Sequence, residues 1–307
     1  MHYLVTGGAG FIGSNLVDRL LKDGHQVRVV DNESTDSHEH FYWNDSAENF
    51  KWDIGTADDW AMKVLTKDID VILHLAAEAR IQPAIKNPKL TTRTNVLGTC
   101  NMLQGARENG VKRVVYSSTS ASYGLKNKPP VTEDMTRDCL NAYSITKCAG
   151  EDFCKMFHDM YGLETIIFRY FNVYGERQPT KGQYAPVIGL FQKQYEEGLP
   201  MTIVGDGKQT RDFTYVGDVV DANIKASTTE NKDAFGEIFN IGTGNSYNMF
   251  DLVKMVGGDD AKYEFIPERL AEIRDSKANT DKAKNILDWN YTTKLEDWIT
   301  SCKQQLA

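Results

Sequence analysis

Two residues near the middle of the chain, Tyr143 and Lys147, have the types and the spacing that proton transfer requires. They lie in the stretch Tyr-Ser-Ile-Thr-Lys, at the start of a segment in which apolar residues recur with helical spacing. Side chains four residues apart share one face of a helix, so the phenol and the ammonium group would point the same way. A cation beside a phenol stabilises the phenolate and lowers the pKa of the tyrosine toward neutrality. The pair predicts a general base, provided that a cofactor and a substrate bind beside it.

A glycine-rich turn at the N terminus predicts that cofactor. Residues 1–6 read as a buried strand, and Gly7, Gly10 and Gly13 follow it at three-residue spacing. An apolar helix begins at Phe11, within the glycine run. Glycines at this spacing allow a tight strand-to-helix turn and a close approach of the backbone to a pyrophosphate, which the N–H groups of the helix N terminus then bind. The segment therefore predicts a dinucleotide-binding turn.

The residue at the end of the next strand indicates which dinucleotide is bound. The apolar stretch 26–30 ends on Asp31. A carboxylate at this position accepts hydrogen bonds from the ribose hydroxyls of NAD and repels the 2′-phosphate of NADP. Asn32 and Glu33 follow it, and neither can replace the arginine that a 2′-phosphate needs. We therefore expect NAD as the cofactor.

Apolar strands alternate with amphipathic helices along the first part of the chain. Strands are expected at 71–75, 111–117 and 164–170, and helices at 88–108 and 142–161. This alternation is typical of an α/β protein whose parallel sheet is covered on both faces. Together with the glycine turn, it predicts a doubly wound Rossmann sheet.

The pattern changes after residues 174 and 175, where shorter elements with Gly and Pro punctuation begin. We expect a Rossmann domain over 1–174, which carries the catalytic residues, and a smaller α/β substrate-binding region over 175–307. The segments of the two parts are expected to interleave. Residues 32–49 form a polar loop without a clean period.

Composition excludes several classes of function. The 307 residues carry a formal net charge of −8, which argues against nucleic acid as the main partner. No stretch reaches the length of a membrane span and no signal peptide is evident, so a cytoplasmic location is expected. The five cysteines lack metal spacing and read as reduced thiols, with Cys148 and Cys154 as packing residues. Residues 36–40 include two histidines but have no third ligand nearby, so no metal is expected.

Seven motifs, taken together, resemble the extended short-chain dehydrogenase/reductase family. In chain order they are TGGAGFIGSNL, LHLAAEARI, NVLGT, YSSTSASYG, YSITK, RYFNVYGERQ and GDGKQTRDFTYVGDV. Within this family they are similar to the NAD-dependent nucleotide-sugar 4-epimerases. With the C-terminal pattern ending at Trp289, the resemblance covers nearly the whole chain. It implies NAD as the cofactor and a nucleotide sugar as the ligand of the 175–307 region.

The resemblance also implies roles for individual residues. Tyr143 would be the base, Lys147 would activate it and hold the nicotinamide ribose, and Thr119 would bond the sugar hydroxyl that is oxidised. Asn95 would support the active site from a neighbouring helix. The cofactor contacts expected in full are Gly7, Gly10, Phe11, Ile12, Gly13, Asp31, Asn32, Asp53, Ile54, Leu75, Ala76, Ala77, Asn95, Ser117, Tyr143, Lys147 and Tyr170.

Residues of the second half would bind the nucleotide sugar, together with Thr119 and Tyr143. Asn172, Arg211 and Arg269 match the family's diphosphate ligands, and planar guanidinium groups bind phosphate oxygens in a bidentate way. The remaining two matches are Glu272, at the position of the family's nucleoside-ribose ligand, and Ser276, beside the 2-substituent of the sugar. A small residue at that last position leaves room for an N-acetyl group.

The two residues after Thr119 indicate which reaction follows oxidation. Ser120 and Ala121 stand where the family's dehydratases have Asp-Glu, and the decarboxylases usually keep a glutamate at the second position. The resemblance therefore favours epimerisation at C4 of UDP-glucose or UDP-galactose, and of their N-acetylated counterparts, through a transient 4-keto sugar. Open alternatives are a uronic-acid 4-epimerase, in which Arg80 or Arg177 would meet a carboxylate, a decarboxylase, a 4,6-dehydratase, or a non-catalytic dinucleotide-binding protein.

A homodimer is also expected. The helices near 90–108 and 142–160 resemble those that form a four-helix interface in this family. Their outer faces are expected to carry apolar residues such as Leu97, Met102, Phe153 and Phe157, some of which must face the chain's own sheet.

Overall fold

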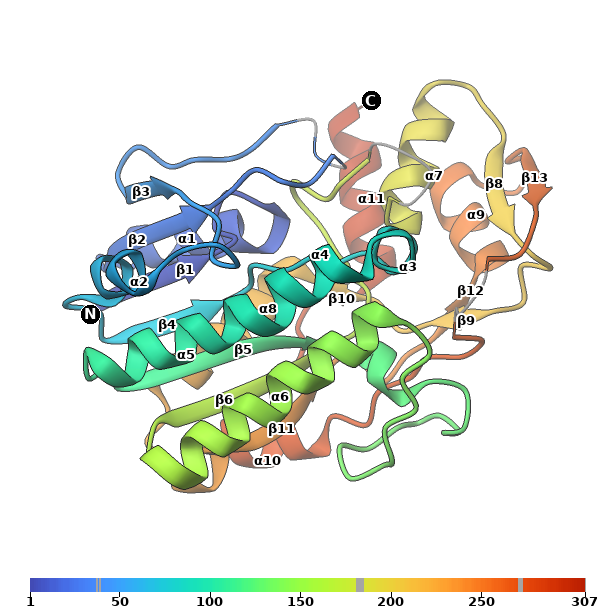
Figure 1. The fold of residues 1–307 in the computed structure, drawn as a ribbon. Coiled ribbons are helices and arrows are strands. Elements are labelled where there is room, and N and C mark those ends of the chain that lie inside the picture. Colours follow the sequence, from blue (N-terminus) through green and yellow to red (C-terminus); the bar gives the residue numbers. More distant parts are fainter. Residues whose placement is uncertain (37, 39, 181–184, 270–272, 307) are drawn as a thin grey trace.

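A seven-stranded parallel sheet forms the centre of the molecule, with strand order β11-β6-β5-β4-β1-β2-β3 (Figure 1). All neighbouring strands in it are parallel. The order reverses between β1 and β4, and doubly wound sheets bind ligands at the carboxyl ends of the strands near such a point. The expected α/β Rossmann fold is confirmed. The strands are β1 (His2–Thr6), β2 (Gln26–Asp31), β3 (Glu48–Lys51), β4 (Val71–His74), β5 (Arg113–Thr119), β6 (Glu164–Tyr170) and β11 (Glu237–Ile241).

The structure is a computed structural model that describes residues 1–36, 38, 40–180, 185–269 and 273–306. No helix within these ranges combines the length and the apolar character needed to cross a membrane.

Helices cover both faces of the sheet, because successive residues of a strand point to opposite sides. In β1, Tyr3 and Val5 belong to one buried cluster, whereas Leu4 belongs to another. The first cluster includes residues of α1 (Phe11–Lys22), α8 (Val216–Thr228) and α10 (Asp281–Leu287). The second includes residues of α2 (Asp59–Thr66), α5 (Gly98–Glu108) and α6 (Ala142–Tyr161), of which α5 and α6 lie side by side across the sheet (Figure 1).

The helical segment predicted at 88–108 is divided into three pieces. α4 (Pro88–Thr92) and α5 are joined by a π-helical turn, Arg93–Leu97. A π turn makes i→i+5 hydrogen bonds and therefore holds one residue more than an α turn. Asn95 in this turn is buried, whereas Leu97 is 49% exposed. The hydrophobic period alone did not predict this irregularity.

Two of the four residues expected on the outer helix faces lie inside. Met102 and Phe157 are buried in the cluster that α5 and α6 share with the sheet. Leu97 and Phe153 line an outer apolar groove between the two helices. Fewer apolar residues therefore lie on the outer faces of these helices than the sequence suggested.

A third buried cluster forms the core of the C-terminal region and includes Phe191, Ile203, Leu252 and Trp298. Its main elements are α7 (Val187–Glu196), β8 (Met201–Val204), α9 (Met249–Gly257), β13 (Tyr263–Ile266) and α11 (Leu295–Leu306). Short strand pairs join it to the sheet side: β7 (Val173–Tyr174) with β10 (Thr214–Tyr215), and β9 (Thr210–Arg211) with β12 (Tyr247–Asn248). The chain also returns to the central sheet, since β11 pairs with β6.

Candidate active site

The turn between β1 and α1 requires glycine at two positions. Gly7 has a φ of +68°, and a Cβ on it would lie 2.9 Å from the backbone nitrogen of Ala76. A Cβ on Gly13 would lie 2.1 Å from the carbonyl oxygen of Gly7. Gly10 is the N-cap of α1, and no side chain caps this helix. The close backbone approach and the uncapped helix N terminus fit the pyrophosphate of a dinucleotide.

Asp31 ends β2 beside this turn. Its carboxylate accepts hydrogen bonds from the backbone N–H groups of Ala9 (3.2 Å) and Glu33 (2.8 Å). Burial raises the pKa of Asp31, although these backbone hydrogen bonds oppose the shift. The carboxylate is thus held in place next to the glycine turn, where ribose hydroxyls of NAD would be within reach.

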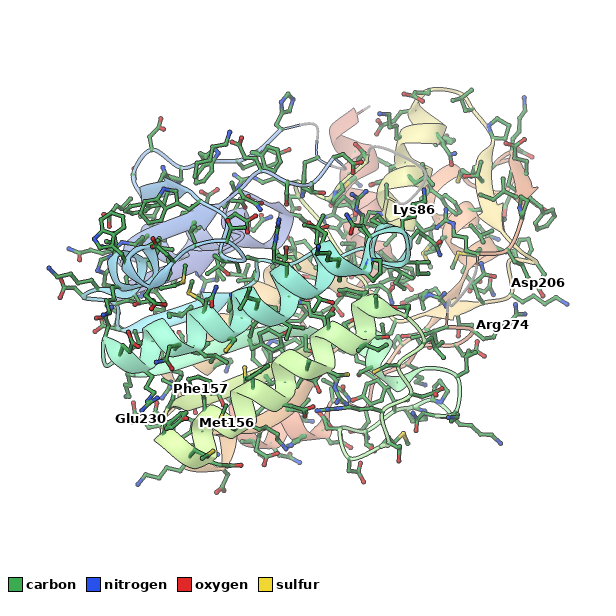
Figure 2. All side chains as sticks on the ribbon, viewed as in Figure 1. Lys86, Met156, Phe157, Asp206, Glu230 and Arg274 are labelled. Atoms are coloured by element: carbon green, nitrogen blue, oxygen red, sulfur yellow. The ribbon has the colours of Figure 1, made fainter. Side chains whose placement is uncertain are left out.

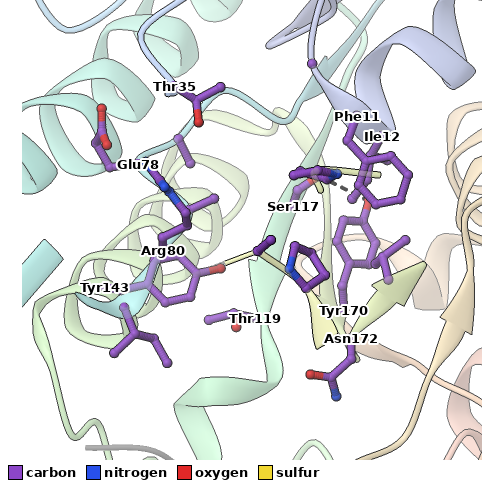
Figure 3. A pocket seen from close by; sticks show the side chains of 18 of the residues that line it. Phe11, Ile12, Thr35, Glu78, Arg80, Ser117, Thr119, Tyr143, Tyr170 and Asn172 are labelled. Atoms are coloured by element: carbon purple, nitrogen blue, oxygen red, sulfur yellow. Dashed lines mark hydrogen bonds between the residues drawn. The ribbon is translucent and has the colours of Figure 1, made fainter. Parts of the chain in front are cut away.

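A cavity of about 600 Å³ extends from the glycine turn to the C-terminal region. Ligand sites of drug-sized molecules have volumes of this order. Of the predicted site residues, those that line it are Gly7, Gly10, Phe11, Ile12, Gly13, Asp31, Asn32, Ile54, Leu75, Ala76, Ala77, Ser117, Thr119, Tyr143, Lys147, Tyr170, Asn172, Arg211, Arg269 and Ser276. Figure 3 shows this cavity, with Thr119 and Tyr143 facing each other at one side.

Thr119 and Tyr143 come from the ends of two adjacent elements. Thr119 is the last residue of β5, and its side-chain oxygen accepts a hydrogen bond from the N–H of Ala121 (3.1 Å). Tyr143 lies in the first turn of α6, which begins at a capping box formed by Asn141 and Ser144. Both side chains line the cavity, and the Thr119 side chain acts to lower the pKa of the Tyr143 phenol.

Lys147 is buried one turn further along α6. Its Nζ donates a hydrogen bond to the carbonyl oxygen of Ser117 (2.7 Å) and lies 5.0 Å from the centre of the Tyr116 ring. Burial lowers the pKa of Lys147 to about 7. Desolvation disfavours the charged form of an amine, and the nearest acidic groups compensate only in part.

Burial opposes the expected effect of Lys147 on the phenol. It raises the pKa of Tyr143 above its ordinary value, and the Thr119 side chain only partly opposes this. The sequence argument placed a full positive charge beside the phenol. In the structure the amine is desolvated and directed at a backbone carbonyl, so the protein alone favours the neutral phenol.

Tyr170 closes the cavity from β6, the strand next to β5. Its hydroxyl is hydrogen-bonded to the Ser117 hydroxyl (3.1 Å; Figure 3) and accepts a hydrogen bond from the Asn223 side chain (2.8 Å). Burial raises the pKa of Tyr170 to about 12, so it is a fixed neutral group. These bonds order the wall between β5 and β6.

Asn172, Arg211 and Arg269, which are expected at the diphosphate, also line the cavity. The Asn172 side chain donates to the carbonyl oxygen of Asp212 (2.8 Å), which orients it at the start of the C-terminal region. Arg211 donates to the carbonyl oxygens of Thr210 (2.9 Å) and Arg274 (3.0 Å). Arg274 is itself held by a two-bond contact with Asp206 near the edge of the molecule (Figure 2).

Ser276 is buried and lines the same cavity. Its backbone N–H donates to the carbonyl oxygen of Thr210 (3.1 Å), whereas its hydroxyl oxygen has no hydrogen-bond partner among the described residues. The side-chain oxygen of Gln209, another cavity residue, is likewise without one.

Three predicted site residues are not placed at the cavity. Asp53 accepts a hydrogen bond from the Gly55 N–H (2.8 Å) and forms part of a turn. Asn95 lies behind the cavity wall, where its side chain bonds both the N–H and the carbonyl of Glu78 (2.8 and 3.1 Å). It therefore positions the segment after β4 instead of contacting the cavity. Glu272 lies outside the described residues.

Sequence reasoning missed several cavity residues. The segment after β4 contributes Glu78, and the loop after β2 contributes His38 and Phe41. These positions belong to irregular loops, so no hydrophobic period could locate them. Arg80, which the sequence offered as a possible carboxylate ligand, also lines the cavity. Arg80 pairs with Asp36 at the cavity.

The second basic residue considered for a carboxylate, Arg177, pairs with Asp18 (2.5 Å) and does not line the cavity. Among the described residues there is no group of three or more His, Cys, Asp or Glu side chains that could hold a metal ion.

The doubly wound sheet, the glycine turn and the residues at the ends of β5 and α6 define an enzyme that works with a bound dinucleotide. The chain belongs to the NAD dependent epimerase/dehydratase family, whose model matches residues 3–242. Its cofactor is accordingly NAD.

Curated relatives and solved structures of high similarity cover almost the whole chain. The UDP-glucose 4-epimerase of Mycolicibacterium smegmatis is 36% identical, over 97% of this chain and 96% of that protein. The UDP-glucose 4-epimerase of Thermotoga maritima, solved with UDP-glucose, has a TM-score of 0.91 at 33% identity and full coverage of both chains. The UDP-glucuronic acid 4-epimerase of Bacillus cereus, solved with UDP-glucuronic acid and NAD, has a TM-score of 0.89 at 30% identity, also over both whole chains.

Proposed function

We propose that this protein is an NAD-dependent 4-epimerase of UDP-hexoses, which interconverts UDP-glucose with UDP-galactose and also accepts their N-acetylated counterparts. One observation carries the proposal. Thr119, Tyr143 and Lys147 share a cavity with the glycine turn, while Ser120 and Ala121 follow Thr119 in a short 3-10 helix. Dehydration or decarboxylation would be expected to need a carboxylate in that helix.

The side chains at the ends of β5 and α6 move one proton. Thr119 would orient the C4 hydroxyl of the sugar toward the phenolic oxygen of Tyr143, which takes the proton as a general base. The desolvated Lys147, whose pKa is about 7, changes its protonation state close to physiological pH. A positive charge at Lys147 or at a bound nicotinamide lowers the pKa of Tyr143 and so opposes the effect of burial.

NAD, when bound, supplies a reversible acceptor for the C4 hydride, so it is not consumed. The residues expected at the diphosphate keep the sugar from leaving. Asn172, Arg211 and Arg269 would hold the diphosphate while the 4-keto sugar turns about it. The turned sugar presents its other face, and Tyr143 returns the proton to the C4 oxygen. The reaction requires that the diphosphate stay bound while the sugar is free to rotate.

The wall near Ser276 supports the choice of sugars. The small side chain of Ser276 lines the cavity and leaves space beside the sugar. A uronic acid is the second candidate, because Arg80 lines the cavity and one similar structure holds UDP-glucuronic acid. Arg80 is already paired with Asp36, so a sugar carboxylate would have to compete for it.

The test is a panel of nucleotide sugars. Purified protein is incubated with UDP-, dTDP-, GDP- and CDP-sugars, including UDP-glucuronic acid, and the products are identified by NMR and mass spectrometry. We expect C4 epimers of UDP-glucose and UDP-N-acetylglucosamine, with no change in mass. Loss of water or of carbon dioxide from any substrate would overturn the proposal. Denatured protein should release NAD or NADH, and mainly NADP would contradict the role of Asp31.

A further inference from the structure

Two cysteines lie in contact beside the N terminus of α6. The sulfur atoms of Cys139 and Cys148 are 3.4 Å apart. Cys148 belongs to the second turn of the helix and is 5% exposed, whereas Cys139 lies in the preceding loop and is partly exposed. A small oxidant can therefore reach one sulfur atom, and the other lies directly behind it.

The surroundings favour a thiolate at the outer sulfur atom. Contact with the Cys148 sulfur, together with the Ser144 hydroxyl and the charge of Arg137, lowers the pKa of Cys139 to about 7. Arg137 is held in place by Glu151 (3.0 Å) and Asp152 (2.7 Å). The same contact raises the pKa of Cys148, which stays a thiol. A low-pKa, accessible cysteine beside a second thiol is the arrangement of a redox-sensitive site.

We propose that Cys139 and Cys148 form a redox-active dithiol that exchanges with small disulfides such as glutathione disulfide. The Cys139 thiolate attacks one sulfur of glutathione disulfide, a mixed disulfide forms, and glutathione thiolate leaves. Cys148 then loses its proton to solvent and attacks the Cys139 sulfur, which releases the second glutathione thiolate. The protein loses two electrons and two protons, and glutathione disulfide is reduced to two thiols. The product is a Cys139–Cys148 disulfide.

The new bond would enclose the reacting side chains. Tyr143 and Lys147 lie between the two cysteines in sequence, so the disulfide ring contains both. A disulfide needs its sulfur atoms about 2 Å apart, so one of them must move by more than an ångström. Side-chain rotation can supply part of this movement, and the rest falls on the loop that leads from Cys139 into Asn141, the helix cap, because Cys148 is held in α6. We expect the resulting displacement of the first helical turn to slow turnover. This consequence rests on the proposed role of Tyr143.

The experiment treats the protein with glutathione disulfide near neutral pH and follows intact mass, disulfide-linked peptides and UDP-glucose turnover. Wild type should lose two hydrogens, give one linked peptide pair containing Cys139 and Cys148, and lose at least tenfold in turnover, all reversed by dithiothreitol. Cys148→Ser should stop with one glutathione on Cys139, because the resolving thiol is gone. Cys139→Ser should keep its activity under oxidant, and Cys302→Ser should respond like wild type.

The outcomes separate the parts of the inference. Thiols at Cys139 and Cys148 that stay reduced, a stable glutathione adduct on Cys139 of the wild type, or modification at Cys100 or Cys302 alone would overturn the dithiol. A disulfide that forms without any loss of turnover would overturn its effect on Tyr143. Failure of the proposed epimerase activity is seen separately, since the mass measurements need no substrate.

Discussion

The carboxylate of Glu151 receives two hydrogen bonds from the guanidinium group of Arg169, at 2.9 and 2.8 Å, and both side chains are almost completely buried. The Ser118 hydroxyl adds a third hydrogen bond to the same carboxylate (2.5 Å), and Arg137 adds a second ion pair (3.0 Å). One residue of α6 is thus joined to β5, to β6 and to the loop before the helix. Thr119 follows Ser118 directly, so this network holds the active-site end of β5 against α6.

Glu151→Gln should destabilise the fold. The substitution removes the buried counter-charge of Arg169 and one of the two carboxylate partners of Arg137, which keeps Asp152. Breaking a buried ion pair such as Arg169–Glu151 costs about 3–5 kcal/mol. Urea unfolding followed by circular dichroism measures the free energy. Asp152→Asn is the matched control, because its ion pair with Arg137 is largely exposed and should be worth less than about 1 kcal/mol. Equal effects of the two substitutions would contradict the buried network as a source of stability.

Tyr143→Phe should lower turnover by orders of magnitude while the fold and the bound NAD remain. The substitution removes the proton acceptor and keeps the ring that packs at the start of α6. Initial rates with UDP-glucose measure the loss, and NAD content per chain shows that the site is intact. Turnover within tenfold of wild type would refute the assignment of the base.

Lys147 should make stability rise with pH. Its pKa is about 7 in the folded protein, and an unfolded lysine titrates near 10.4. Between about pH 7 and pH 10 the unfolded chain holds a proton that the folded chain has released, so higher pH favours the folded state. The free energy of unfolding of the wild type, relative to that of Lys147→Met, should therefore rise by on the order of 1 kcal/mol per pH unit in this window. Urea unfolding at several pH values tests it, and a constant difference would show that the amine is not desolvated.

Ser276→Tyr should close the cavity to N-acetylated sugars. A phenol ring in place of the buried serine overlaps the space for an acetamido group and costs about 1–3 kcal/mol of transition-state binding. Competition kinetics with UDP-glucose and UDP-N-acetylglucosamine measure the preference. Ser276→Ala is the control, since it removes the hydroxyl without adding bulk. An unchanged preference in Ser276→Tyr would mean that another residue selects the sugar.

The protein should form a homodimer through the groove between α5 and α6. Leu97 is 49% exposed in this groove, whose other lining residues include Val96 and Phe153. Light scattering at micromolar concentration should give twice the 34.6 kDa chain mass. Leu97→Glu should yield the monomer, whereas Leu199→Glu, also exposed but in the C-terminal region, should not. A wild-type particle of 34.6 kDa would count decisively against the interface.

The sequence predicted elements well where apolar periodicity and a stop signal coincide. The helix expected at 142–161 and the strand expected at 164–170 have those bounds in the structure, because Asn141 caps α6 and Gly162 ends it in a left-handed conformation. The π turn was not predicted, since one extra residue changes hydrogen bonding without breaking the apolar pattern.

Residue types predicted contacts better than they predicted electrostatics. The glycines and Asp31 meet at the cavity because backbone geometry places them there. The raised pKa of Tyr143 depends on how deeply α6 packs and on where the Lys147 side chain points, and neither is encoded in the spacing of four. Asn95, which was expected to support the active site from a neighbouring helix, does so by binding the backbone of Glu78, in a loop that sequence patterns could not place.

The return of β11 to the edge of β6 has a consequence for biosynthesis. When residues 1–174 have emerged from the ribosome, six of the seven sheet strands are available. The edge of β6 is then still unpaired, and the apolar side chains that α8 later covers would face water. Such an intermediate is open to pairing with another chain. The nascent protein must therefore stay unassembled, or be shielded, until residue 241 has emerged. A gene truncated near the apparent domain boundary should then yield insoluble protein in place of an isolated NAD-binding unit.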